Sequence, residues 1–478
     1  MSPLAVIITI VAYFAVMLLI SWLSGRGGNG SSDFYGGRKS NWLLVAIAMI
    51  GAPMSGVTFV SVPGMVGVSG MGYIQMLLGF MVGYVVIAYV LTPLYFKLNV
   101  VSIYQYLEQR FGVSSYKTGA WFFFISKMLG ASVRLFLVCL ALQLLVFDPL
   151  GLPFALNVLI SVLIVFLYTF RNGVRSVIWT DTLRTFCMVV AVVLSIIFIA
   201  KNLGLDFKGL VTTIRDSSMS RVFYFDDVNH PQFFWKQFLG GLFTVIATTG
   251  LDQDMMQRTL SSKNGKDSQK NLITSSILQT VVISMFLCLG VLLYMFAAAN
   301  GISETGDKLF PAVATSGLLP IAVGVLFIVG LVASAYGAGG SALTSLTTSF
   351  TIDILGAAGK DKVRKWVHVG MAVLMALTII VFNALNNTST IDAVYKLASY
   401  TYGPILGMFT FGILMKKPVR DRWVPVVAIV APLICLVLQL NSERWFGGYK
   451  FSYELLLLNA GLTFLGLCCL IRKAPAEA

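Results

Sequence analysis

Four ionisable residues of this sequence lie deep inside long apolar stretches. They are one acid, Asp181, and three bases, Lys127, Arg134 and Arg184. A charged group in an apolar medium is costly unless it is paired or hydrated, so each of the four is a candidate functional group. Because three bases stand against one acid, the balance favours a binding site for a negatively charged ligand.

Asp181 and Arg184 are three residues apart, so their side chains share one face of a helix. Two roles are open for Asp181: it coordinates a cation, or it forms an ion pair with Arg184. In the second case the fixed guanidinium of Arg184 could itself replace a cation. The substitution Arg184→Gln separates these roles. A structural pair predicts loss of folding, whereas a substituting guanidinium predicts stronger dependence on the cation.

Arg134 presents a planar fork of donors that matches the geometry of a carboxylate or a phosphate. We therefore expect it to bind an anionic solute, although backbone carbonyls or Asp181 could also satisfy it. Ser55, Thr58 and Gln75 are polar, uncharged residues that could line the same cavity. The alternative for the two hydroxyl residues is a packing role, in which they bond to the preceding helical turn.

The composition indicates which elements carry these residues. Of 478 residues, 57% are apolar and 11% are charged, a balance that excludes a soluble domain of this length. Apolar stretches of about 18 to 30 residues recur along the chain, and each is long enough to cross a membrane as a helix. They predict an all-α polytopic membrane protein with thirteen transmembrane helices, at about 4–24, 41–66, 72–97, 117–146, 153–170, 175–201, 233–256, 271–299, 319–356, 364–386, 391–415, 421–440 and 451–472.

The basic residues are concentrated in alternate loops, for example Lys263, Lys266 and Lys270 in one of them. Cytoplasmic loops of membrane proteins carry such an excess. The distribution predicts a multi-pass protein of the cell (inner) membrane, with the amino terminus outside and the carboxyl terminus in the cytoplasm. It also accounts for the net charge of +14 without a nucleic-acid partner.

No segment has the composition of a soluble domain, so residues 1–478 are predicted to form a single transmembrane domain. Two predicted spans contain residues that break helices. The second span has Gly51, Pro53 and Gly56, and the seventh has Gly240, Gly241 and Gly250. Matched breaks indicate an inverted-repeat transporter, whereas glycines that only permit close helix packing are the alternative. The repeats would cover 41–201 and 233–415, with peripheral helices at 4–24 and 421–472.

Several motifs resemble the sodium:solute symporter family, and their order and spacing make the resemblance specific. They are Asp33-Phe34-Tyr35-Gly36-Gly37-Arg38, Ser55-Gly56-Val57-Thr58-Phe59 with Pro63-Gly64, Tyr104 to Gly112, Trp179-Thr180-Asp181, Gly250-Leu251-Asp252-Gln253-Asp254 with Gln257-Arg258, and Tyr402-Gly403-Pro404. The resemblance implies a LeuT-like core of ten helices, arranged as five plus five, with three peripheral ones. It also implies transport by alternating access.

The resemblance further implies a sodium site that uses carbonyls of the broken helix and hydroxyls of the eighth core helix. The matching positions are Gly51, Met54, Ser334, Gly337 and Ala338. Members with a second sodium site would use positions that match Asp181, Gly337, Gly340 and Ser341. Where the family usually has two adjacent hydroxyl residues, this sequence has Gly337 and Ala338. Since a hard cation requires a shell of oxygens, this departure weakens the expectation of sodium at the site.

The sequence therefore predicts a secondary active transporter that couples sodium to the symport of a small organic solute, and the charge balance of the spans favours an anionic one. The alternative is a carrier or solute-binding sensor that has lost the conserved sodium site. An enzyme is disfavoured because no catalytic set of residues lies in the spans. The predicted partners are the solute and the lipid bilayer, with sodium as the coupled ion and no obligate protein partner.

Overall fold

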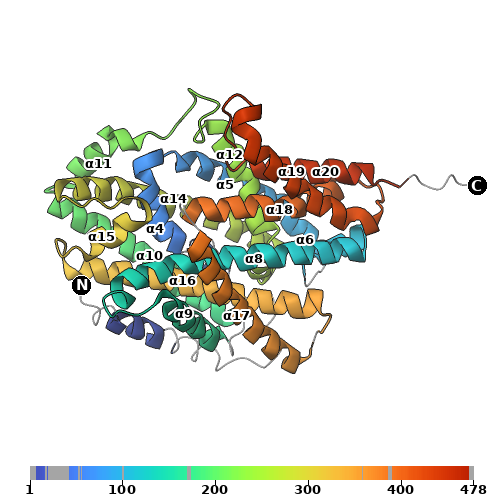
Figure 1. The fold of residues 1–478 in the computed structure, drawn as a ribbon, viewed down its shortest axis with the longest axis horizontal. Coiled ribbons are helices and arrows are strands. Elements are labelled where there is room, and N and C mark those ends of the chain that lie inside the picture. Colours follow the sequence, from blue (N-terminus) through green and yellow to red (C-terminus); the bar gives the residue numbers. More distant parts are fainter. Residues whose placement is uncertain are drawn as a thin grey trace, which may run out of the picture.

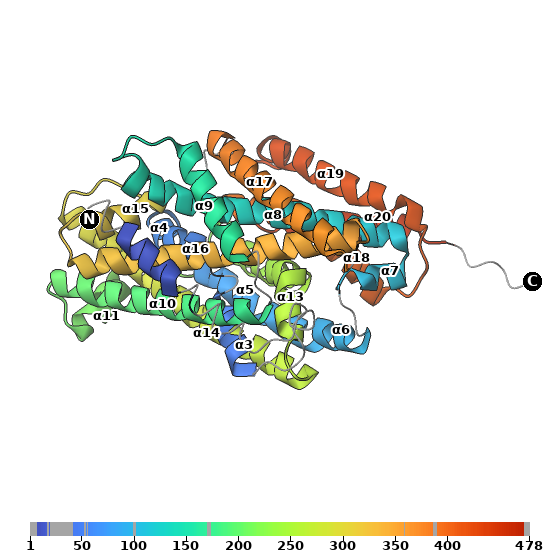
Figure 2. The ribbon, with the colours of Figure 1, turned by 90° about the horizontal axis from the view of Figure 1, so that it is seen from below.

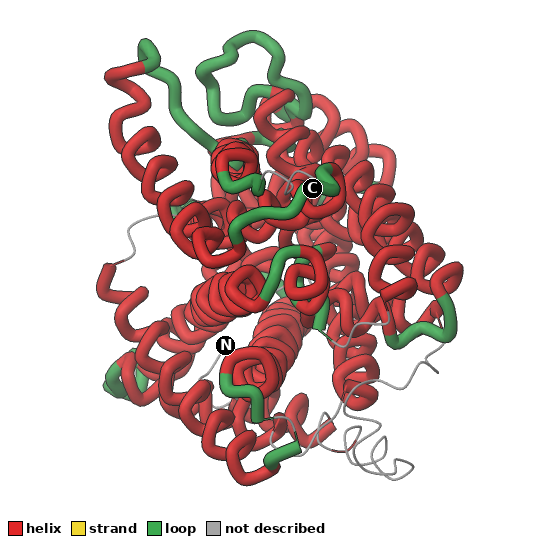
Figure 3. Tube along the Cα trace, turned by 90° about the vertical axis from the view of Figure 1, so that its right-hand side faces the viewer, coloured by secondary structure: helices red, strands yellow, loops and turns green. Residues whose placement is uncertain are grey.

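The computed structural model describes residues 7–16, 19, 42–51, 54, 56–98, 102–169, 174–357, 359–385 and 390–472. This part of the chain is almost entirely helical. It contains no β-strand, and Val419 and Ile471 form an isolated bridge. The long helices run along the longest axis of the molecule (Figure 1), and several are seen end on when the molecule is viewed along that axis (Figure 3). The prediction of an all-α fold is confirmed.

The elements of the first half are helices joined by short turns. They are α3 (Trp42–Gly51), α4 (Gly56–Ser69), α5 (Tyr73–Val86), η1 (Ile87–Leu91), α6 (Thr92–Leu98), α7 (Gln105–Arg110), α8 (Val113–Leu142), η2 (Gln143–Phe147), α9 (Phe154–Thr169), α10 (Val174–Asn202), α11 (Phe207–Asp216) and η3 (Ser218–Ser220). A further helix, Ile7–Val16, precedes them.

The second half continues in the same way. Its elements are α12 (Phe234–Val245), η4 (Ile246–Gly250), α13 (Gln253–Leu260), α14 (Gly265–Ala299), η5 (Gly306–Lys308), α15 (Leu309–Thr315), α16 (Ile321–Ser349), η6 (Phe350–Ile354), α17 (Asp361–Leu385), α18 (Thr390–Leu414), η7 (Asp421–Trp423), α19 (Val424–Trp445) and α20 (Leu455–Cys469).

Among the described residues, eight helical segments are long and apolar enough to cross a membrane, and several shorter apolar helices accompany them. The count of thirteen spans is therefore not confirmed. Helices α11 and α7 lie at opposite ends of the molecule (Figure 2). This placement agrees with the predicted alternation of outer and inner connections, and the membrane side that each end faces stays a prediction.

The second predicted span is interrupted, as its composition indicates. Helix α3 ends at Gly51, α4 begins at Gly56, and Met54 between them is not helical. Pro53 and Ser55 lie outside the described residues. Helix α3 packs against α10 and α14, and α4 packs against α14 and α16. The two pieces of this span therefore end within the packed bundle, where their terminal backbone groups are available to a ligand.

The seventh span is also interrupted, but only one of the three glycines that predicted a break lies next to it. After the π-helical turn η4, Leu251 and Asp252 leave the helical conformation, and α13 begins at Gln253. The break thus follows Gly250. Gly240 and Gly241 lie inside α12, which packs closely on α5. Gly240 and Gly241 therefore permit close packing, which was the alternative to a helix break.

Replacing Gly241 by alanine is expected to destabilise the folded protein by about 1–3 kcal/mol, because a Cβ atom there would overlap the carbonyl oxygen of Met76. Gly370→Ala is the matched control, since its Cβ would meet no atom within 4 Å. Thermal unfolding of both variants in one detergent measures the effect. Equal melting temperatures for the two variants would contradict the close contact between α12 and α5.

Candidate solute and cation site

A cavity lies between the interrupted helices and the long helices that surround them. Residues of α4, α5, α8, η4, α13, α14, α16 and α18 line it. The lining combines aromatic rings, hydroxyl groups and charged side chains. The charged residues in the lining are Lys127, Arg134, Asp252, Asp254 and Arg258. This mixture suits a small polar ligand better than an apolar one.

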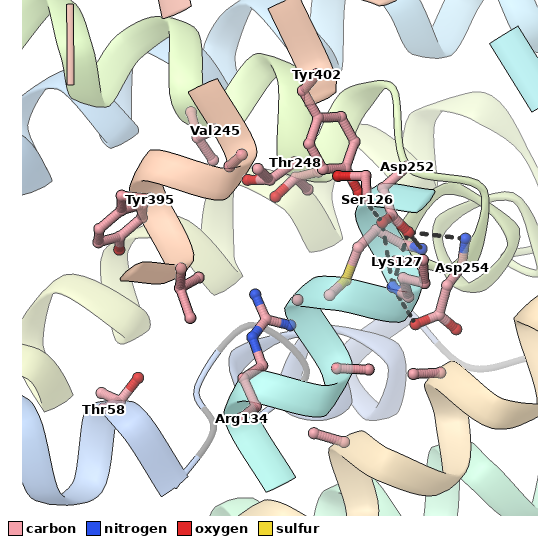
Figure 4. Close-up of a pocket in the computed structure, with 18 of the residues that line it drawn as sticks. Thr58, Ser126, Lys127, Arg134, Val245, Thr248, Asp252, Asp254, Tyr395 and Tyr402 are labelled. Atoms are coloured by element: carbon pink, nitrogen blue, oxygen red, sulfur yellow. Dashed lines mark hydrogen bonds and ion pairs between the residues drawn. The ribbon is translucent and has the colours of Figure 1, made fainter. Parts of the chain in front are cut away.

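Arg134 and Lys127 reach the cavity from the same helix. They are seven residues apart on α8, which is two helical turns, so both side chains project from one face. The guanidinium of Arg134 points into the space between Thr58 and Tyr395 (Figure 4). In the part of the chain that the structure describes, no ion pair or hydrogen bond involves Arg134. Its donors are therefore available to a ligand.

Lys127, in contrast, is fully engaged. Its ammonium group donates to both carboxylate oxygens of Asp252 and to Oδ2 of Asp254, each at 3.1 Å. The hydroxyl of Tyr402 donates to Asp252 at 2.7 Å. Asp252 also caps α13, since its carboxylate accepts from the backbone N–H groups of Asp254 and Met255. The break after Gly250 thus places two carboxylates at the cavity.

Behind this pair lies a second group of charges, centred on Asp181. Its Oδ1 is 3.0 Å from Nη2 of Arg184, and its Oδ2 is 2.6 Å from Nη1 of Arg258. Arg258 also pairs with Asp254, since its Nη2 is 3.3 Å from Oδ1 of Asp254. Ser341 donates to Asp254 at 2.7 Å and also accepts from Arg258. The structure therefore shows the ion pair of Asp181 and Arg184, and the carboxylate of Asp181 is not bonded to Arg134.

These two groups form one continuous network of balanced charge. It joins three cations with three carboxylates, namely Lys127, Arg184 and Arg258 with Asp181, Asp252 and Asp254. Arg134 stands outside it. The surplus positive charge of the cavity therefore belongs to Arg134, because every other charged residue in the lining has a partner of opposite sign.

Asp181 is not alone as a buried acid, contrary to the sequence-based expectation. Asp252 is also buried, and Asp254 is mostly buried. Arg258 joins Asp181 to Asp254, and Lys127 joins Asp254 to Asp252. The apolar pattern places these residues near the end of the seventh span and so concealed their burial. The spacing of Asp254 and Arg258, four residues apart on α13, is the signal in the sequence that could have indicated a pair.

Two residues expected to bind the solute have different surroundings. Thr58 lines the cavity. Gln75 does not, because its amide donates to the carbonyls of Gln232 and Gly72 and accepts from the backbone N–H of Tyr224. Gln75 thus joins the start of α5 to the loop before α12. Ser55 lies outside the described residues.

Two of the expected sodium positions lie against a guanidinium. Gly51, at the end of α3, and Gly337, on α16, both lie against Arg184: a Cβ atom would be 3.2 Å from Nε and 2.7 Å from Nη1, respectively. The Ser334 hydroxyl donates to the Leu331 carbonyl at 2.8 Å. Gly337 and Ala338 have no side-chain oxygen. The described residues at this place do not fit a sodium ion, which requires an oxygen shell and no adjacent cation.

Comparison with known proteins identifies the family of the chain. The model of the sodium:solute symporter family matches residues 34–421. The chain is 25% identical to the sodium/sialic acid symporter SiaT of Proteus mirabilis, over 97% of this chain and 94% of that protein. It is 27% identical to human sodium-coupled monocarboxylate transporter 1, over 91% and 72%. A solved structure of a substrate-bound, outward-open Na⁺-coupled sialic acid symporter has a TM-score of 0.81, at 21% identity and 97% coverage of both chains.

An all-helical bundle with two interrupted helices around a charged cavity defines a polytopic secondary transporter with a LeuT-like fold. The family match covers most of the chain and includes both interrupted helices. The chain belongs to the sodium:solute symporter family. It is therefore a sodium-coupled symporter of an organic solute and not an enzyme.

Proposed function

We propose that this protein transports a small carboxylated solute, and that sialic acid is the first candidate. The observation that carries the proposal is the guanidinium of Arg134, which has no ion pair or hydrogen bond among the described residues, in a cavity whose other charges are paired. A guanidinium binds a carboxylate through two parallel hydrogen bonds. The relatives named above carry sialic acid and monocarboxylates, which share that group.

The remaining lining supplies the contacts that a sugar acid requires. Thr58 and Thr248 provide hydroxyl groups in the cavity lining, and aromatic rings of α5 and α18 provide apolar surface. The hydroxyls of Tyr73 and Tyr395 lie 2.5 Å apart and join α5 to α18 at the cavity. We expect this hydrogen bond to break when the solute passes between α5 and α18.

The proposed transport cycle uses the two predicted repeats, 41–201 and 233–415, which would move relative to each other around the cavity. The two helix breaks, one in each repeat, support this division. The proposed orientation in a cell inner membrane is the one that the basic loops predict, with the amino terminus outside and the carboxyl terminus in the cytoplasm.

Thermal stabilisation by a matched pair of ligands tests the carboxylate. Sialic acid and its methyl ester differ at that group alone, so the acid is expected to raise the melting temperature while the ester has little effect. A ligand at 100 times its dissociation constant stabilises the folded state by about 2.7 kcal/mol. Pyruvate and lactate, with their amides, extend the panel to smaller acids. Equal shifts with acid and ester would contradict recognition by Arg134.

A further inference from the structure

We infer that the guanidinium of Arg184 takes the place of the sodium ion at the conserved site of this protein. Any sodium that is coupled to transport then binds elsewhere. The inference concerns the cation and holds for whichever solute binds beside Arg134.

The first observation is the position of Arg184. Its side chain is 1% exposed and extends from α10 into the space between the end of α3 and the middle of α16. These are the two helices whose residues the resemblance assigns to sodium. The last carbonyls of a helix carry partial negative charge and have no partner within the helix. A cation at the end of α3 is therefore favourable, and Arg184 supplies one from within the chain.

The second observation is the glycine at position 337. A side chain there would bring its Cβ atom to 2.7 Å from Nη1 of Arg184, closer than Cβ atoms approach other atoms, and to a tight 3.1 Å from Cδ. A hydroxyl residue at position 337 would thus require the guanidinium of Arg184 to shift from its present position. Glycine at position 337 lacks the hydroxyl that a sodium site would use, and it also leaves the space that the guanidinium occupies. The missing hydroxyl and the guanidinium at the site are therefore two parts of one structural exchange.

The third observation is the set of available donors. Among the described residues, Nε and Nη1 of Arg184 have no hydrogen-bond partner, although both are buried. Nε lies against Gly51 and Nη1 against Gly337, two positions that the resemblance assigns to sodium. The remaining nitrogen, Nη2, contacts Asp181. The guanidinium of Arg184 thus already places a positive charge at the site, and this charge would repel a sodium ion bound beside it.

The second sodium position of the resemblance is occupied in a similar way. Asp181 has one carboxylate oxygen on Arg184 and the other on Arg258, and Ser341 contacts both Arg258 and Asp254. The charge that sodium would contribute when it binds is permanent here. The guanidinium of Arg184 thus places between α3 and α16 a cation that does not depend on the sodium concentration.

Sodium titrations of thermal stability, at constant ionic strength with choline, test the inference. Three proteins are compared: the natural chain, Ser334→Ala, and the triple variant Arg184→Gln/Gly337→Ser/Ala338→Ser. We expect Ser334→Ala to leave the half-saturating sodium concentration within twofold of the natural chain. The triple variant restores hydroxyl oxygens and removes the guanidinium, so it is expected to gain a sodium-specific rise of several degrees.

Two outcomes would overturn the inference. One is a tenfold or larger increase in the half-saturating sodium concentration of Ser334→Ala, which would place sodium beside Arg184. The other is a folded triple variant that gains no sodium response. If the triple variant does not fold, the comparison with Ser334→Ala decides alone. A natural chain that shows no sodium response, yet is stabilised by a carboxylate, would support the inference while contradicting sodium coupling.

Discussion

Arg134→Gln is expected to weaken binding of the carboxylated solute by about 100-fold, which corresponds to about 2.7 kcal/mol. The reason is that, within the described part of the chain, Arg134 is the charged residue in the cavity lining without a partner of opposite sign. Truncating one member of a hydrogen-bonded charge pair costs about 2–5 kcal/mol. Isothermal titration of the purified variant with sialic acid, or with the acid that stabilises the natural chain most, measures the change.

Two further variants show whether the effect comes from the guanidinium itself. Arg134→Lys keeps the charge and loses the planar fork, so we expect an intermediate loss of about tenfold. Arg215→Gln is the matched control, because Arg215 is exposed on α11 and pairs with Asp216 outside the bundle. Unchanged affinity in Arg134→Gln, with the protein folded, would show that the carboxylate binds elsewhere.

Asp181→Asn is expected to cost about 3–5 kcal/mol of folding free energy, enough to abolish recovery of folded protein from the membrane. Asp181 is fully buried and pairs with both Arg184 and Arg258. Its neutral amide would leave two buried guanidinium groups without adequate compensation. The yield and melting temperature of detergent-purified protein measure the effect. Asp216→Asn removes a carboxylate from an exposed pair and is expected to behave like the natural chain.

The double variant Asp181→Asn/Arg184→Gln tests whether uncompensated positive charge causes the loss of folding free energy. It removes one cation together with the carboxylate, so the charge of the network stays balanced. We expect it to recover part of the folded yield that Asp181→Asn loses. If Asp181→Asn alone folds with a normal melting temperature, the network of six charges does not hold α8, α10 and α13 together.

The fold was predictable because the length of an apolar stretch directly reflects the thickness of the membrane. The break between α3 and α4 was also predictable, since glycine and proline act on the local backbone. Arg134 and the pair of Asp181 and Arg184 could be found because charges are rare in apolar stretches. In these cases the physical cause lies within one turn or one span of the sequence.

The remaining features depend on contacts between distant segments. Lys127 and Asp252 are 125 residues apart, and the bond between Gln75 and Gln232 joins segments 157 residues apart. Nothing local in the sequence distinguishes Gly241, which packs against α5, from Gly250, which precedes a break. The role of Gly337 also becomes visible only when Arg184 from another helix lies against it.

Uptake of radiolabelled sialic acid into proteoliposomes under an inward sodium gradient tests the central claim most directly. The natural chain is expected to accumulate the acid above its equilibrium concentration, unlabelled acid is expected to compete, and the methyl ester is not. Arg134→Gln proteoliposomes, which contain folded protein, are expected to show background uptake. If the natural chain accumulates neither sialic acid nor a smaller carboxylate, or if the ester competes as well as the acid, carboxylate transport through Arg134 is contradicted.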